Sequence, residues 1–291
     1  MQYPVPSDTN WSVLPAIGIV GMRNVRISAD RHPCGSELAD VIDRFWTVRW
    51  KVPPGEQGSA VFIGHPETNL VLGSGRVSAY GVQRKRLTVR FSGTGSAFGM
   101  AFRPGAALGL LGGTAVQYTD RSRPLAESWG TAEVRRFEEA LRAATDTGSR
   151  IAVVERHVRA RLRMSHGEER DQGLSRVEEI VDMMRDEQSI TRVSEVCRHS
   201  HLSTRSLQRL FRHYLGISPK WLLRQYRLQT AAARLAAGLP QRWTEIAVDL
   251  GYFDESHFAR DFTQIVGVTP SSYARNRVRA STAAATAERA A

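Results

Sequence analysis

Side chains of the kinds that bind DNA recur at helical spacing in the C-terminal third of the chain. Between residues 203 and 214 they are Arg205, Gln208, Arg209 and Arg212. A guanidinium bonds to guanine or to a phosphate oxygen, and a glutamine amide pairs with adenine, so the set holds donors suited to a duplex. Offsets of three and four residues bring side chains to one side of an α-helix. The chemistry that this pattern predicts is recognition rather than catalysis.

The residue pattern of this segment occurs twice in the chain. Residues 207–219 read LQRLFRHYLGISP, and residues 258–270 read FARDFTQIVGVTP. Six positions carry equivalent residues in the two copies: Leu207/Phe258, Arg209/Arg260, Phe211/Phe262, Gly216/Gly267, Ser218/Thr269 and Pro219/Pro270. The repeated positions are expected to build a common framework. Side chains found in one copy alone (Arg205, Gln208 and Arg212) are therefore favoured as base or phosphate contacts.

The first copy has the pattern of a short capped helix. Ser203 is a suitable N-cap, because its hydroxyl accepts a hydrogen bond from a free backbone N–H. Apolar residues then follow at i, i+3, i+4 and i+7 and form one inward face: Leu207, Leu210, Phe211 and Tyr214. The opposite face is polar and free of acidic residues: Thr204, Arg205, Gln208, Arg209 and Arg212. Gly216 ends the helix, and Ser218-Pro219 begins the next one.

A short helix precedes each copy. In TRVSEVCRHS, residues 191–200, the inward residues are Val193, Val196 and Cys197. Before the second copy they are Trp243, Ile246, Ala247 and Leu250, with Gly251 at the turn and Asp254 as the cap. Helix, tight turn and helix with a basic outer face is the layout of a helix-turn-helix DNA reader.

The segment between the copies has a length that suits two readers on one duplex. PKWLLRQYRLQTAAARLAA, residues 219–237, reads as a single helix. At ~1.5 Å per residue it spans roughly 28 Å. Major-groove windows on one face of B-DNA lie about 34 Å apart. The repeated skeleton therefore predicts a chain that reads two adjacent turns of DNA.

The candidate DNA-binding residues come from both reading helices. They are Thr204, Arg205, Ser206, Gln208, Arg209 and Arg212 on the first, and Glu255, Ser256, His257 and Arg260 on the second. For Arg209 and Arg260 a solvated face, or a salt bridge to an acid of the preceding helix, is weighed evenly with DNA contact. Glu255 reads equally well as an acid stabilised by the dipole of its own helix.

Positive charge is concentrated in the same region. The chain has a net charge of +11, and residues 189–291 hold 15 basic and 7 acidic residues. A basic third is typical of a nucleic-acid binder. The alternative explanation for the positive charge is a general bias toward arginine, since 37 of the 40 basic residues are arginine. Residues 189–227 carry +7 and residues 228–279 carry +1, so the first reader is expected to supply most of the phosphate attraction.

The rest of the chain predicts an α+β protein of two domains, a β-rich N-terminal domain with packed helices and an all-α C-terminal domain with two helix-turn-helix motifs. Five segments have the composition of strands: FWTVRW, SAVFIG, NLVLGS, RLTVRFS and AFGMAFR. Helical spacing starts near Ala126. The expected divisions are 1–164 for the N-terminal domain, 165–173 for a linker, 174–278 for the DNA-binding domain and 279–291 for a flexible tail.

Length and composition exclude several classes. At 291 residues the chain has room for two cores. No apolar run approaches the ~20 residues of a membrane span, and the N-terminus has no pattern of a signal peptide. The two cysteines, Cys34 and Cys197, do not indicate a disulfide framework. The expected location is the cytoplasm, associated with the nucleoid, and no cofactor is predicted.

The C-terminal motifs resemble the AraC/XylS family of bacterial transcription regulators. The resemblance rests on the repeated S-x-x-x-L-x-R-x-F-x-x-x-x-G-x-S-P, on Arg227 and Ala231 between the copies, and on GYFDESHFARDF in the second copy. It implies a seven-helix DNA-binding domain that begins with a helix over residues 174–186, and activation of transcription through contact with RNA polymerase. Cys197 stands where a small alanine is usual, and His201 stands where the turn usually has glycine.

The N-terminal part resembles the β-rich domain of undefined function that precedes such DNA-binding halves. WKVPPG, FRPGAALGLLGG and TDRSRPLAESWG carry this resemblance. By analogy with cupin-like sensor folds, we expect an effector or dimerisation domain. Double-stranded DNA is the predicted partner, and a small-molecule effector and a homodimer stay open as further partners.

Other residues of the N-terminal part are of types that can bind metals or ligands or react. His32, Cys34 and His65 lack the spacing of metal ligands, so no metal site is predicted. HPCG around Cys34 leaves open an alternative function, a DNA-binding alkyl-transfer protein. A DNA-binding architectural protein without an effector is a third class. Phe45, Trp46 and Trp50 are expected to lie on a strand and pack a core, with one of them left as a candidate for a ligand pocket.

Overall fold

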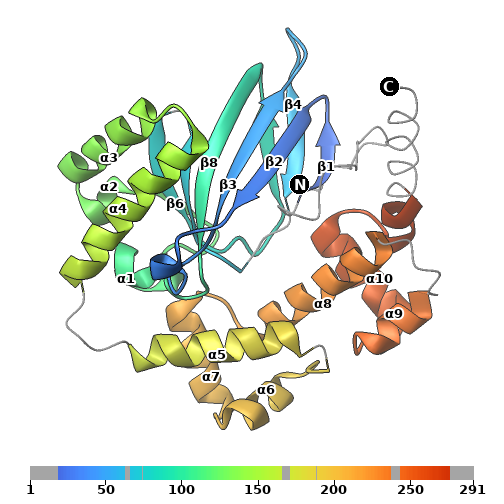
Figure 1. Ribbon diagram of the computed structural model, residues 1–291. Helices are drawn as coiled ribbons and strands as arrows, with labels where there is room; N and C mark the ends of the chain where they lie inside the picture. Colours follow the sequence, from blue (N-terminus) through green and yellow to red (C-terminus); the bar gives the residue numbers. More distant parts are fainter. Residues whose placement is uncertain are drawn as a thin grey trace.

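The computed structural model describes residues 19–62, 66–73, 75–165, 171–187, 189–236 and 243–275. Figure 1 shows two parts, strands with flanking helices up to residue 165 and a group of helices from residue 171 onward. The expected α+β architecture, with a β-rich N-terminal region and a helical C-terminal region, is confirmed. Residues 276–291, which include the expected tail, and His65 lie outside the described residues.

The strands of the described residues form two antiparallel sheets. Their bounds are β1 Ile19–Arg23, β2 Arg26–His32, β3 Ile42–Lys51, β4 Gly58–Phe62, β5 Asn69–Gly73, β6 Arg76–Tyr80, β7 Leu87–Phe91, β8 Thr94–Phe102 and β9 Ser122–Pro124. One sheet has the order β1-β4-β7, and the other has the order β2-β3-β8-β5-β6-β9. The five segments with strand composition correspond to β3, β4, β5, β7 and β8.

Strand β8 is built to carry large neighbours on one face. Gly95 and Gly99 lie beside strand β3, and a Cβ at either position would collide with the indole ring of Trp50 or Trp46 respectively. Successive residues of a strand point to opposite faces, so Phe98, between these small residues, faces the other way. Phe98 is buried in the hydrophobic core. The small residues of one face make room for the two indole rings, and the other face is packed in the hydrophobic core.

The filled face of the larger sheet packs against helices. The helical elements of the N-terminal domain are η1 Ser36–Leu38, α1 Leu108–Leu111, η2 Ala115–Gln117, α2 Ala126–Trp129, α3 Thr131–Ala143 and α4 Thr147–Ser165. Phe45 of β3 and Phe137 of α3 are almost fully buried in the same core. The indole of Trp129 donates to the carbonyl of Leu110 at 2.9 Å, which joins α2 to α1. In Figure 1 these helices cover one side of the sheet.

The C-terminal domain has two hydrophobic cores that share one long helix. Its helices are α5 Gln172–Asp186, α6 Val193–Ser200, α7 Thr204–Tyr214, α8 Pro219–Ala236, α9 Trp243–Asp249 and α10 Glu255–Val266, and residues 270–275 are also helical. The first core contains Phe211 and Leu222, and the second contains Leu228 and Phe262. Helix α8 supplies Leu222 to one and Leu228 to the other, so it links the two halves.

The two domains contact each other near the end of α7. The hydroxyl of Thr119 donates to the carbonyl of Gly216 at 3.1 Å. Gly216 has a φ of 69°, and a Cβ there would collide with Thr119 and with the backbone of Ala115. Arg103 pairs with Asp182 of α5 at 3.0 Å. The N-terminal domain therefore contacts the first helix-turn-helix motif directly.

Candidate nucleic-acid interface

The turn between α6 and α7 is formed by a residue in the left-handed region. His201 has a φ of 52°, and its N–H donates to the carbonyl of Arg198. The N–H of Leu202 donates to the carbonyl of Cys197 at 3.1 Å, which closes the end of α6. His201 thus lies in the left-handed region that favours glycine, and its side chain crowds the following carbonyl there.

Helix α7 begins with the cap that the sequence predicts. The hydroxyl of Ser203 accepts from the N–H of Ser206 at 3.1 Å. Ser206 also accepts a hydrogen bond from the Ser203 hydroxyl at 3.0 Å, and it is half-buried. Ser206 is therefore engaged at the helix start, in contrast to its more exposed neighbours. Leu207 and Phe211 anchor the opposite side, with no exposed surface.

The polar face of α7 is open to solvent. Its exposed residues are Thr204, Arg205, Gln208, Arg209 and Arg212. Among the residues that the structure describes, none of the three arginines forms an ion pair. The acid of the preceding helix, Glu195, instead accepts from the N–H groups of Thr191 and Arg192. These backbone bonds hold the pKa of Glu195 below its usual value.

The second motif has the same construction. Gly251 has a φ of 68°, and Asp254 accepts from the N–H of His257 at 2.6 Å. Phe258 and Phe262 lie on the inward face of α10 and are fully buried. The four candidate residues of this motif, Glu255, Ser256, His257 and Arg260, are all exposed.

Arg260 differs from its counterpart on α7. Its Nε donates to the carbonyl of Ser256 at 3.3 Å, so the side chain lies back along α10. Asp261, the next residue, forms a two-bond pair with Arg224 of α8, with both N···O distances at 2.9 Å. The carboxylate of Asp261 is thus taken up by the scaffold. The second reader offers one arginine where the first offers three.

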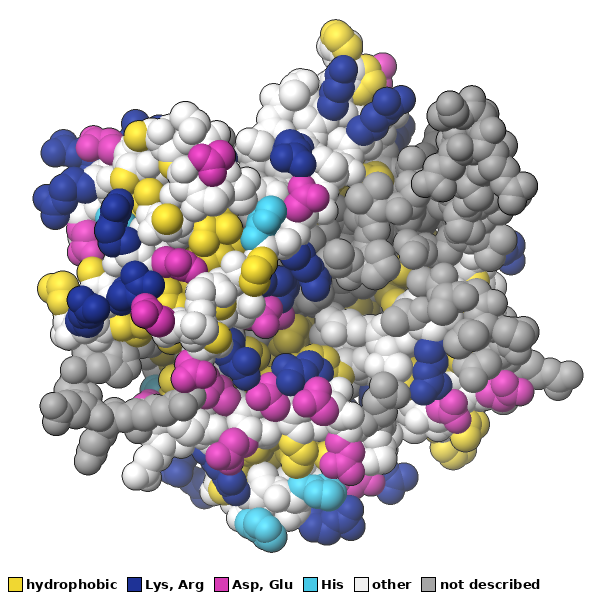
Figure 2. Space-filling view, in the orientation of Figure 1, with side chains coloured by type: hydrophobic (Ala, Val, Ile, Leu, Met, Phe, Trp, Pro, Cys, Tyr) yellow, Lys and Arg dark blue, Asp and Glu magenta, His cyan; other side chains and the backbone are white. Residues whose placement is uncertain are grey.

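The surface charge follows this division. Figure 2 shows Lys, Arg and His side chains gathered at the lower edge of the view, over α6 and α7. Acidic side chains lie above them, over α5, where Glu179 and Asp186 are exposed. In this view a basic edge therefore lies next to an acidic helix.

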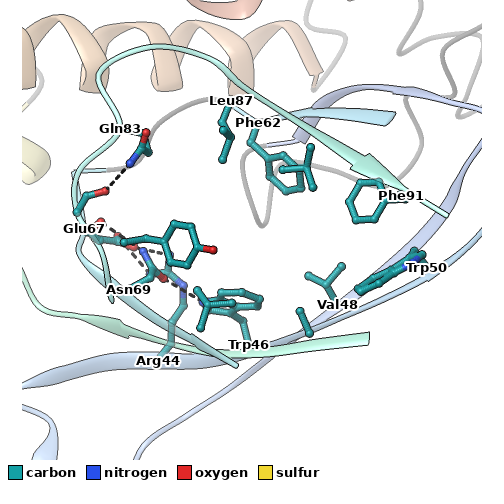
Figure 3. Close-up of a pocket in the computed structure, with 15 residues that line it drawn as sticks. Arg44, Trp46, Val48, Trp50, Phe62, Glu67, Asn69, Gln83, Leu87 and Phe91 are labelled. Atoms are coloured by element: carbon teal, nitrogen blue, oxygen red, sulfur yellow. Dashed lines mark hydrogen bonds and ion pairs between the residues drawn. The ribbon is translucent and has the colours of Figure 1, made fainter. Parts of the chain in front are cut away.

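A cavity of about 300 Å³ lies between the two sheets of the N-terminal domain. Its walls are mostly aromatic and aliphatic, as Figure 3 shows, and they include Trp46, Val48, Trp50, Phe62, Leu87 and Phe91. Small-molecule sites have volumes of about 300–1,000 Å³ and a few polar groups in apolar walls. The cavity therefore has the size and lining of a small-ligand site. Of the three aromatics considered from sequence, Phe45 packs the core and the two tryptophans line the cavity.

The polar groups of the cavity gather at one end. Arg44 pairs with Glu67 at 2.6 Å and also with Asp43. Asn69 accepts from the Trp46 indole at 3.0 Å, and its amide donates to the carbonyl of Glu67. This network keeps the indole ring and the ion pair in fixed positions. The alternation of Gly95, Ala97 and Gly99 along β8 is the sequence pattern that indicates room for the indole rings lining the cavity.

The other chemical candidates have structural roles. The thiol of Cys34 donates to the carbonyl of Ile42 at 3.2 Å, and burial raises the pKa of this thiol. A ring nitrogen of His32 lies 3.2 Å from the hydroxyl of Thr47. Within the described ranges, no group of three potential ligands is placed to hold a metal ion. No helix in these ranges is long and apolar enough to cross a membrane.

Two segments of the chain match known families. Residues 196–276 match the family described as "Helix-turn-helix domain". Residues 30–124 match the family described as "Domain of unknown function (DUF6597)".

The curated relatives match short parts of the chain and carry names of transcription regulators. The chain is 38% identical over 82 residues to the HTH-type transcriptional activator RhaR of Pectobacterium carotovorum subsp. carotovorum (strain PC1), which covers 28% of each protein. It is 32% identical over 103 residues to the XylDLEGF operon transcriptional activator 3 of Pseudomonas putida, which covers 35% of this chain and 30% of that protein. The matched part thus spans less than a third of these relatives.

Solved structures with similarity include ToxT from Vibrio cholerae, at 11% identity, 87% coverage of this chain, 99% of that chain and a TM-score of 0.39. A transcriptional regulator with an AraC-type DNA-binding domain from Chromobacterium violaceum is 23% identical and covers 35% of this chain and 92% of that chain, with a TM-score of 0.33.

Fold and exposed basic face together define the C-terminal part as a double helix-turn-helix domain, a class that presents short helices to DNA grooves. The match over residues 196–276 and the relatives named as activators indicate that this domain is of the kind found in transcription regulators. The C-terminal third of this chain holds a helix-turn-helix domain and is similar to regulators of the AraC/XylS type, as its motifs predict.

Proposed function

We propose that the chain is a sequence-specific transcription regulator that reads two adjacent major-groove segments of one DNA duplex. The observation that carries the proposal is the pair of equally built motifs on one helix. Each has a left-handed turn residue, a capped reading helix and two buried aromatic or aliphatic anchors. Helix α8 joins them with 18 residues, or roughly 27 Å at ~1.5 Å per residue.

The proposed contacts divide between bases and phosphates. Arg205 and Gln208, on the outer face of α7, are assigned to base edges, and Thr204, Arg209 and Arg212 to the backbone. On α10, Ser256, His257 and Arg260 contact the second segment, with Glu255 and Asp254 at the helix start. Ser206 contributes through the backbone geometry of the cap.

The N-terminal domain is proposed as the regulatory part. Its cavity has the size of an effector site, and its surface touches the first motif through Thr119 and Gly216. By analogy with the relatives named as activators, we infer activation through contact with RNA polymerase. A homodimer formed through the N-terminal domain belongs to the same proposal.

The test is selection of binding sites by the full chain from a random DNA pool, followed by footprinting. We expect a recurring site with two protected segments about 10 base pairs apart. A single protected segment would remove the two-reader proposal, and equal recovery of all sequences would favour an architectural DNA binder. Transcription in vitro from a promoter with the selected site then tests activation.

The alkyl-transfer alternative is not favoured by the chemistry of Cys34. A nucleophilic cysteine needs an accessible thiolate. Here the thiol donates to a carbonyl, and burial raises its pKa, which keeps the thiol protonated. Cys34→Ser is expected to leave DNA binding unchanged.

A further inference from the structure

Two segments of the cavity wall also belong to the contact with the C-terminal domain. One is the loop from Gly81 to Gln83, after strand β6, and the other is the end of strand β4. In both, adjacent residues contact different surroundings, the cavity on one side and the C-terminal domain on the other. Each segment therefore has one surface toward the cavity and one toward a DNA-reading motif.

The loop after β6 reaches the first motif. Gly81 and Gln83 line the cavity. Val82, between them, is 3% exposed and lies in the hydrophobic core formed by α5, α6, α7 and α8. The loop is held firmly, since Asp120 accepts from the N–H of Arg84 at 2.6 Å and pairs with its guanidinium at 2.7 Å. A shift of the loop would move Val82 within that core.

Strand β4 reaches the second motif. Phe62 lines the cavity, as Figure 3 shows, and its neighbour Val61 packs against the core that holds Phe258 and Phe262. Packed interiors transmit small displacements because they contain few voids. The cavity wall is therefore in contact, one residue away, with the cores beneath both reading helices.

The polar end of the cavity lies near the helix shared by both motifs. Tyr226 of α8 has a raised pKa, chiefly because of burial, and the negative charge of Glu67 adds to the rise. Glu67 is thus one of the charges that act on Tyr226 of α8. A ligand that changed the Arg44–Glu67 pair would change the electrostatic interaction of Glu67 with Tyr226 of α8.

The lining indicates the chemical class of the ligand. The two indoles and the rings of Phe62 and Phe91 favour a flat, apolar molecule. The cation at the polar end, Arg44, already pairs with two carboxylates, so it is not available to balance a further negative charge. A neutral molecule with one hydroxyl or carbonyl group fits this end, and an anion would face uncompensated desolvation.

We propose that this cavity binds a small, flat, neutral, mostly apolar molecule, and that its occupancy is transmitted to both helix-turn-helix motifs through Val82 and Val61. The inference rests on the proposed function, and it names the ligand class and the route of regulation. A ligand that fills the cavity holds the wall in one position and thereby holds both motifs in one arrangement.

The ligand class is tested with two matched probes on the full chain. Quenching of tryptophan fluorescence should report saturable binding of 2-naphthol, because Trp46 and Trp50 line the cavity. The anion 2-naphthoate should bind at least about tenfold more weakly. Ala97→Phe, which fills the same face of β8, should abolish the binding of 2-naphthol while the circular dichroism spectrum is retained. Equal binding of both probes, or binding that survives Ala97→Phe, would overturn the ligand assignment.

The route is tested by hydrogen exchange, which needs no DNA. Saturating 2-naphthol should slow amide exchange in α7 and α10 of the wild-type chain. In the double variant Val61→Ala, Val82→Ala, 2-naphthol should bind within about twofold of wild type, but exchange in both helices should no longer respond. Val153→Ala on α4 is the matched control, since Val153 packs in the separate core of sheet and helices. It should keep the full response.

DNA affinity supplies the second readout on the same samples. We expect 2-naphthol to strengthen binding to the selected site at least about fivefold, in the range of measured allosteric couplings, and the double variant to lose this effect. A response of exchange without any DNA binding would support the route and remove the proposed function. DNA binding with an unchanged response in the double variant would remove the route alone.

Discussion

At the scale of single residues, Arg205, Gln208 and Arg212 share the exposed face of α7 but are expected to act differently. Arg205→Ala or Gln208→Ala should relax preference at one or two base pairs, with a cost of about 1–3 kcal/mol for each lost two-bond contact. Arg212→Ala should weaken all sequences alike, because a phosphate contact carries no sequence information. The measurement is the affinity for the selected site and for single-base variants of it.

A matched control for these changes is Arg135→Ala on α3, an exposed arginine of the N-terminal domain. It should leave both affinities unchanged. If Arg205→Ala and Gln208→Ala weaken selected and random DNA by the same factor, the assignment to base edges is wrong.

His201 gives a prediction about stability. Its φ of 52° is unfavourable for a residue with a side chain, and glycine avoids this crowding. His201→Gly should raise the free energy of unfolding by about 0.5–1 kcal/mol, after the added flexibility of the unfolded chain is counted. His199→Gly, two residues earlier and inside α6, should lower it by about 0.5 kcal/mol. Urea unfolding at 25 °C separates the two, and a loss of stability in both variants would contradict the account of the turn.

The caps and turns were the residues most open to prediction from sequence. Ser203, Asp254 and Gly216 act through the backbone within a few positions of themselves, so local pattern suffices. Most cavity residues could not be predicted from sequence, although Trp46 and Trp50 belong to the aromatics considered for a ligand pocket. Phe62 and Trp46 meet only because two separate sheets face each other, and no spacing along the chain indicates that meeting.

At the scale of elements, the two reading helices are expected to differ in their dependence on salt. Each lost phosphate contact lowers the slope of log K against log[salt] by about 0.9 in magnitude. The triple change Arg205→Ala, Arg209→Ala, Arg212→Ala should therefore flatten the slope by up to about 2.7. Changing Ser256, Arg260 and Thr263 to alanine should flatten it by at most about 0.9, since one arginine is removed. Equal slopes would show that α10 holds the duplex as strongly as α7.

The attachment of α10 to α8 depends on the Arg224–Asp261 pair. The pair is mostly buried, with both N···O distances at 2.9 Å, so removal of one partner leaves an unpaired charge. Arg224→Ala should cost about 1.5–3 kcal/mol of unfolding free energy. The more exposed pair Arg234–Asp249 is the comparison, and Arg234→Ala should cost less than about 1 kcal/mol. Thermal unfolding that ranks the two in the opposite order would contradict this.

Prediction of the strands succeeded where burial leaves a pattern. β3 and β8 are central, rich in aromatic and apolar residues, and visible in the sequence. β2 and β9 are edge strands with mostly polar or exposed residues, so their pairing partners rather than their composition define them. The short helix α1 lies in a segment expected to be β-rich, because four residues are too few to show a helical period.

At the scale of the whole molecule, the segment 171–291 is expected to fold and bind duplex DNA alone. It contains both motifs, α8, and α5 with its cap at Asp171, whose side chain accepts from Gly173, Leu174 and Tyr214. Its unfolding free energy should be lower than in the full chain, because Val82 and Thr119 are missing from the first motif. Circular dichroism and binding against a scrambled basic peptide check this. A helical, soluble fragment that binds no better than the peptide would remove the prediction.

Gly216 joins the domains through a residue that α7 requires for its own termination. Its positive φ ends the helix, and the absence of a Cβ makes room for Thr119 and Ala115 of the other domain. The joint thus uses a shape that any reading helix ending in glycine would present, including the second one at Gly267. A side chain at position 216 would therefore disturb two structures at once, the end of α7 and the place occupied by Thr119 and Ala115.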